Sequence, residues 1–123
     1  MTEAVVTVCF LITALIHFLP VVGVLGAERL AALYSVSIDD PSLEILMRHR
    51  AVMFGILGGL LLGAAFLPAW RPVGLAVGFA SVLSFLGIAP AVGGYNSAIR
   101  KVVIADVVAL LCLCCAGAGL LLS

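Results

Sequence analysis

The stretch "LMRHRAVMFGILGGLLLGAAFLP", residues Leu46–Pro68, decides the fold class. Three consecutive basic side chains, Arg48, His49 and Arg50, stand directly before an apolar run that has no further charge up to Pro68. A helix that crosses a bilayer needs about 20 mostly apolar residues. Basic residues commonly mark the cytoplasmic end of such a helix. The stretch therefore predicts a membrane-spanning helix with the basic triplet at its boundary.

The composition of the whole chain agrees with a membrane protein. Of its 123 residues, 65% are hydrophobic and only 10% are charged, whereas a soluble domain carries about 25% charged residues. A soluble fold of this length cannot bury so much apolar surface. The net charge is zero, so nothing suggests a nucleic-acid partner, and the lipid bilayer is the expected one.

Four segments are long and apolar enough to span a membrane, at about 4–25, 42–67, 72–92 and 100–122. We expect an all-α, integral membrane four-helix bundle that forms a single transmembrane domain over residues 1–123. The sequence "DDPSLEIL" predicts the start of the second helix, with Asp39 or Asp40 as its cap and Pro41 in its first turn. The start of the chain carries Glu3 in place of a basic n-region, which indicates a retained helix and not a signal peptide.

The basic residues predict the orientation of the bundle. Four spans place both termini on one side of the membrane, and that side holds only Arg71. Positive charge favours the cytoplasm, so we expect both termini outside and the first and third connections inside. The basic residues on the expected cytoplasmic side are Arg29, Arg48, Arg50, Arg100 and Lys101.

Small residues recur every four positions along the second helix. Such a pattern allows another helix to approach closely, and it favours either packing within the chain or the face of a homodimer. The residues are Ala51, Gly55, Gly59 and Gly63. Bulk at Gly59 should therefore destabilise the protein more than bulk at Gly58, which lies beside this stripe.

Successive helical residues advance by about 100°, so the three basic residues cannot share one role. Arg48 lies on the small-residue stripe and has Glu44 four residues earlier, which predicts a helical ion pair and an inward direction. Arg50 either extends outward to lipid head groups or meets an acid from another helix. His49 lies between these two directions.

Asp106 stands in "RKVVIADVVALL", roughly 8 Å below Lys101 along the fourth span. An ionised Asp near the middle of a membrane costs about 2.5–3.5 kcal/mol, so such residues face the bundle interior. We expect Asp106 to pair with Arg48 while Arg50 extends to the lipid surface. The alternative is that Asp106 contacts a ligand, a proton or an ion.

His17 lies inside the first span and shares a face with Thr13. Pro20 removes a backbone donor and loosens this turn. His17 is either a hydrogen-bonded structural residue or a proton carrier or ligand contact. No second His or carboxylate stands one turn away, so no metal site is expected. We also expect no cofactor, and we expect small apolar packing for the four cysteines, which are Cys9, Cys112, Cys114 and Cys115.

Polar residues gather in the expected cytoplasmic half of the bundle, whereas the other half is nearly all apolar. This asymmetry predicts a blind pocket that opens to the cytoplasm, and not a continuous pore. The candidate ligand-binding residues are His17, Glu28, Arg48, His49, Tyr95, Asn96 and Asp106.

The segments "GVLGAERLAALYSV", "LMRHRAVMFGILG" and "GGYNSAIRKVVIADVVAL" resemble a family of small, uncharacterised bacterial four-helix membrane proteins. More loosely, the layout is similar to that of DoxX-like proteins. The resemblance implies four helices and a bacterial inner membrane, and it implies no activity. Family members often carry the name phosphopantetheine adenylyltransferase. The soluble enzyme of that name has an α/β fold and an H-x-G-H phosphate site, and this chain has neither that motif nor alternating strands.

Three functions agree with these residues. The bundle binds or moves a small lipophilic or cationic molecule through Asp106 and His17, or it is a membrane enzyme that uses His17 and Asp106 as an acid–base pair on a lipid-like substrate. Alternatively, it is an accessory or structural subunit whose charges serve only folding. A spacious pocket with an unpaired Asp106 favours the first two functions. A tight pair between Asp106 and an Arg, with no cavity, favours the third.

Overall fold

The computed structural model describes residues 2–122, which are almost entirely helical and contain no strand. The elements in chain order are α1 (Thr2–Phe18), the 3₁₀ helix η1 (Leu19–Leu25), α2 (Ala27–Tyr34), α3 (Pro41–Phe66), the 3₁₀ helix η2 (Pro68–Trp70), α4 (Arg71–Val92) and α5 (Ser97–Leu122). Four stretches are long and apolar enough to cross a membrane: Thr2–Leu25, Pro41–Phe66, Pro68–Val92 and Ser97–Leu122. The predicted all-α bundle with four candidate spans is thereby confirmed.

Local signals explain where these helices begin and change. The Asp40 side chain accepts a hydrogen bond from the backbone N–H of Ser42 at 2.9 Å, and Pro41 is the first helical residue of α3, as predicted. Proline suits that position because its missing N–H would have no helical partner. In the first span, α-helical geometry stops at Phe18 and a 3₁₀ helix continues to Leu25, around Pro20.

The short helix α2 lies within the long connection that we expected between the first two spans. Its end is fastened to the start of α5, because the Asn96 side-chain amide donates to the carbonyls of Tyr34 and Ser35 at 2.9 and 3.2 Å. The side-chain oxygen of Asn96 accepts from the backbone N–H of Ile99 at 2.8 Å. One side chain thus caps α5 and holds α2 against it.

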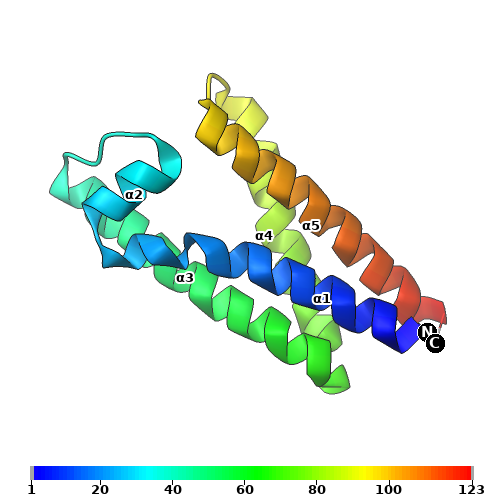
Figure 1. Cartoon of the computed structure of the whole chain (residues 1–123). Helices are drawn as coiled ribbons and strands as arrows, with labels where there is room; N and C mark the ends of the chain where they lie inside the picture. Colours follow the sequence, from blue (N-terminus) through cyan, green and yellow to red (C-terminus); the bar gives the residue numbers. More distant parts are fainter. Residues whose placement is uncertain (1, 123) are drawn as a thin grey trace.

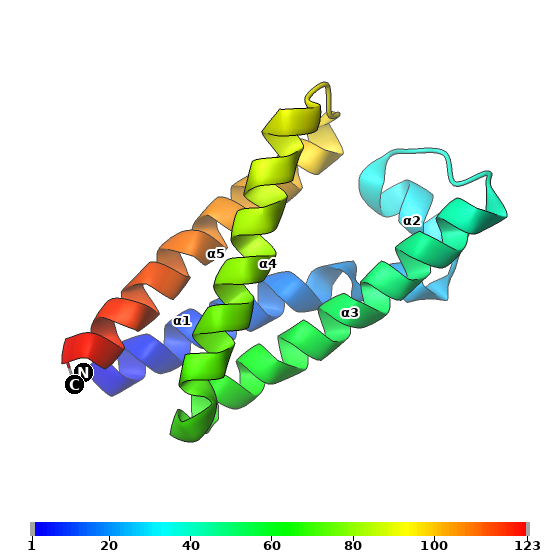
Figure 2. The same cartoon turned by 180° about the vertical axis from the view of Figure 1, so that it is seen from behind.

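The four long helices form two pairs that diverge. Helices α1 and α3 lie side by side, as do α4 and α5, and the two pairs separate toward α2 and the 93–96 connection (Figures 1 and 2). We call this region the α2 end. At the opposite end, which holds Glu3 and Arg71 and which we call the closed end, α1 also packs on α5 and α3 on α4.

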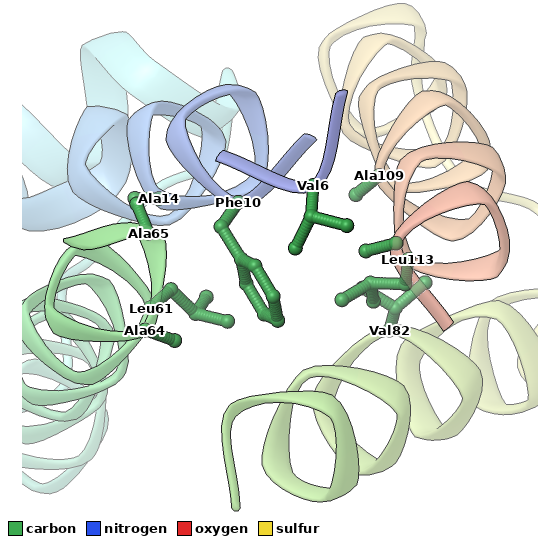
Figure 3. Close-up of a cluster of buried hydrophobic side chains, with 10 residues drawn as sticks. Val6, Phe10, Ala14, Leu61, Ala64, Ala65, Val82, Ala109 and Leu113 are labelled. Atoms are coloured by element: carbon green, nitrogen blue, oxygen red, sulfur yellow. The ribbon is translucent and has the colours of Figure 1, made fainter. Parts of the chain in front are cut away.

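The apolar core fills the bundle from the closed end. The Phe10 ring projects from α1 into the space between the other long helices (Figure 3). Leu61 and Ala64 of α3 lie on one side of it, and Val82 and Leu113 lie on the other. These five side chains are fully buried. Small residues next to them let the helices come close, since a Cβ added at Gly74 would lie 2.8 Å from that of Ala64.

An ion pair between Arg71 and Glu3 joins the helices at the closed end. The buried Arg71 guanidinium donates to both carboxylate oxygens of Glu3, at 2.9 and 2.8 Å. It also donates to the carbonyls of Ala64 and Ala65, at 3.0 Å each, near the end of α3. Arg71 therefore ties α1, α3 and α4 together. This contact was not predicted, because Glu3 and Arg71 are distant along the chain.

The predicted packing face of α3 is partly wrong. Ala51 is buried and Gly55 faces Val21 of η1, but Gly59 has no atom of another element within 4 Å of an added Cβ. The neighbouring Gly58 is closely packed instead, since an added Cβ there would lie 2.9 Å from the Phe18 ring. The last residue of the predicted stripe, Gly63, lies against the Trp70 ring. The packing face of α3 is therefore turned by about one residue toward α1.

Candidate functional site

A cavity of about 650 Å³ lies between the diverging helices at the α2 end. Its walls come from all five α-helices and from η1, and they are mostly apolar. Ligand pockets in proteins typically measure about 300–1,000 Å³ and combine apolar walls with a few polar groups. The apolar walls include Ile16, Leu57, Phe85, Ile88 and Val102. The cavity thus has the size and lining of a small-molecule site.

Among residues 2–122, Asp106 is the only residue that supplies a carboxylate to the cavity wall. It is half-buried on α5. Across residues 2–122, no group lies within hydrogen-bonding or ion-pairing distance of that carboxylate. The cavity therefore contains one acidic group that the rest of the described chain leaves unpaired.

Arg50 turns into the cavity. Its Nη1 donates to the Tyr34 hydroxyl at 2.6 Å, and its guanidinium carbon lies 5.4 Å from the Tyr34 ring centroid and 4.5 Å from that of Phe54. Cations are attracted to aromatic faces at such distances. The expectation that Arg50 extends to lipid head groups is therefore wrong. Lys101 of α5 lines the same cavity.

Arg48 does not pair with Asp106, so that expectation is also wrong. Its Nη1 lies 3.3 Å from Glu44, as the helical spacing predicted, and its Nε donates to the carbonyl of Val24 at 3.0 Å. The side chain is 47% exposed and lies outside the cavity. The physical reason is the rotation of α3: Arg48 points the same way as Gly59, while Arg50 points the same way as Leu57, which lines the cavity.

His17 has a partner at both ring nitrogens. Nδ1 lies 2.9 Å from the carbonyl oxygen of Thr13, and because a carbonyl only accepts, Nδ1 carries the proton. Nε2 lies 2.9 Å from the Ser81 hydroxyl of α4, so in the neutral ring it accepts from that hydroxyl. The ring also packs on Phe54 at 5.8 Å between centroids. His17 therefore forms a fixed part of the cavity wall that joins α1 to α4.

The structure brings only part of the predicted site together. Of the seven candidate residues, His17 and Asp106 line the cavity, and Asn96 fastens α2 at its margin. The remaining four, which lie outside it, are Glu28, Arg48, His49 and Tyr95. Polar residues of the wall that were not among the candidates are Tyr34, Ser35, Arg50, Ser81, Ser84 and Lys101. Tyr34 could not have been found from the pattern, because α2 was expected to be a connection.

The remaining reactive side chains add no second centre. Cys9, Cys112, Cys114 and Cys115 are free thiols, and none of them lines the cavity. In the part of the chain that the structure describes, no group of three or more His, Cys, Asp or Glu residues could hold a metal ion. The cavity is therefore the best candidate site.

Comparison with protein-family models, with curated proteins and with solved structures finds no match to this chain.

Proposed function

We propose that the protein binds a small lipophilic molecule with a cationic group in the cavity, with Asp106 as the counter-ion. The observation that carries this proposal is the unpaired carboxylate in a mostly apolar cavity of about 650 Å³. A charge away from water is costly unless a partner compensates it. A ligand cation supplies that partner, and the apolar walls receive the rest of the molecule.

The alternatives have less support. An acid–base pair of His17 and Asp106 requires a free ring nitrogen near the carboxylate, but Thr13 and Ser81 engage both nitrogens of His17. A purely structural subunit agrees best with a tight pair between Asp106 and an Arg and with no cavity. Within residues 2–122, Asp106 has no such ion pair and the cavity is present.

The same proposal includes a location in the inner membrane of a bacterium, with both termini outside. The four apolar spans support a bilayer. Five of the six Lys and Arg residues belong to the α2 end and its connections, and positive charge favours the cytoplasm. The cavity would then open on the cytoplasmic side. The bacterial setting rests on the family resemblance alone.

Equilibrium dialysis with radiolabelled tetraphenylphosphonium, a lipophilic cation, tests the binding proposal on protein in dodecyl maltoside micelles. We expect saturable binding that Asp106→Asn weakens at least about tenfold, equivalent to about 1.4 kcal/mol. Glu28→Gln is the matched control, because it removes the same charge from an exposed residue outside the cavity. Equal affinity of the native protein and Asp106→Asn would contradict the proposal.

A further inference from the structure

We infer that the ligand is a zwitterionic amphiphile, with an apolar chain and a head group that carries both an ammonium and an acidic phosphate or carboxylate. This inference rests on the proposed function and narrows its ligand class. It depends on the arrangement of opposite charges around the cavity.

Groups of both signs line the cavity without pairing. Asp106 faces it from α5, and Arg50 faces it from α3. Among the described residues, the two side chains form no ion pair. Two opposite charges that share a cavity at a distance are complementary to a head group with two opposite charges.

Arg50 is held in this position. The Tyr34 hydroxyl binds its Nη1, and the faces of Tyr34 and Phe54 lie against the guanidinium. Moving Arg50 to Asp106 would break these contacts. The site is therefore arranged before the ligand arrives, which limits the entropy lost on binding.

Arg50 and Lys101 also have hydrogen-bond donors left to bind an anion. A guanidinium has five N–H donors, and Arg50 uses one nitrogen, for Tyr34. Lys101 lines the same cavity and makes no hydrogen bond or ion pair to any group in residues 2–122. Arginine and lysine donors bind phosphate and carboxylate oxygens well.

A head group with one charge fits this lining less well. A cationic head satisfies Asp106 but meets the positive charges of Arg50 and Lys101. An anionic head satisfies those two residues but meets Asp106. A zwitterionic head satisfies both sides, and the apolar chain contacts Ile16, Leu57 and Phe85.

Three amphiphiles with the same dodecyl chain test this inference: dodecylphosphocholine, dodecyltrimethylammonium and dodecyl phosphate. Each is added at a low mole fraction to dodecyl maltoside micelles, and Kd is measured by microscale thermophoresis. We expect dodecylphosphocholine to bind at least about tenfold more tightly than either singly charged compound.

The variants should separate the two charges of the head group. Asp106→Asn should weaken dodecylphosphocholine and dodecyltrimethylammonium but not dodecyl phosphate. Arg50→Gln should weaken dodecylphosphocholine and dodecyl phosphate but not dodecyltrimethylammonium. Lys101→Gln, at an exposed residue, provides the same test if Arg50→Gln does not fold. Glu28→Gln and Arg29→Gln are the matched controls, since both residues are exposed and lie outside the cavity.

The outcomes distinguish the two proposals. Dodecyltrimethylammonium could bind as tightly as dodecylphosphocholine, with neither Arg50→Gln nor Lys101→Gln changing the affinity for any compound. In that case the inference of a zwitterionic ligand is wrong, while the proposed cation site remains supported. If no compound depends on Asp106, both proposals are wrong. Free phosphocholine, which lacks the dodecyl chain, is the last compound. If it binds as tightly as dodecylphosphocholine, the inference that the ligand has an apolar chain is wrong, and the ligand is a water-soluble zwitterion.

Discussion

At the residue scale, the direction of each charged side chain follows from the rotation of its helix. The cost of a buried charge predicted that Asp106 faces the interior, and the structure places it in the cavity wall. The same reasoning could not choose between Arg48 and Arg50, because beyond these residues α3 is apolar on nearly every face. The packing of Phe18 on Gly58 sets the rotation, and that contact is not visible in the sequence.

A double-mutant cycle tests this placement of the two arginines. Because Arg48 contacts Glu44 and Val24 and not Asp106, the effects of Asp106→Asn and Arg48→Gln on the free energy of unfolding should add within about 0.5 kcal/mol. Glu3→Gln with Arg71→Gln is the positive control, since these two side chains form a bidentate pair. Coupling between Asp106 and Arg48 as large as in that control would show that the two residues meet.

At the scale of the helices, the sequence predicted what depends on length, charge and local backbone chemistry. The four spans and the cap at Asp40 follow from such signals. Helix α2 does not, because isolated helices shorter than about 12–15 residues are marginal in water and α2 has 8 residues. It depends on tertiary contacts: Leu30 is buried close to Gly23, and Asn96 holds the carbonyl of Tyr34.

The neighbouring glycines of α3 offer a matched test of the packing face. Gly58→Leu should lower the melting temperature in detergent, since overpacking costs about 1–3 kcal/mol and the Phe18 ring occupies the space that the new side chain needs. Gly59→Leu introduces the same side chain one residue along, where an added Cβ meets nothing within 4 Å, and should have little effect. The stripe predicted from the sequence implies that Gly59→Leu lowers the melting temperature more than Gly58→Leu does. That result would show that the predicted stripe is the packing face.

At the scale of the whole molecule, the two ends of the bundle differ in what holds them. At the closed end, the helices are held together by the Phe10 ring, the small residues around it and the Arg71–Glu3 ion pair. At the other end, α2 and Asn96 connect helix pairs that have already diverged. The uneven distribution of polar residues predicted a pocket in one half of the bundle. Its shape was not predictable, because it depends on how far the helix pairs diverge.

The orientation of this asymmetric bundle decides from which side the cavity can be filled, and cysteine labelling tests it. With the four native cysteines replaced, Ser37→Cys places a thiol in the exposed connection at the α2 end, and Ala69→Cys places one in the exposed turn at η2. Because five of the six basic residues belong to the α2 end and its connections, an impermeant maleimide added to intact cells should label Ala69→Cys. It should reach Ser37→Cys only after permeabilisation. The reverse pattern would place the termini inside, and the cavity would then take its ligand from outside the cell.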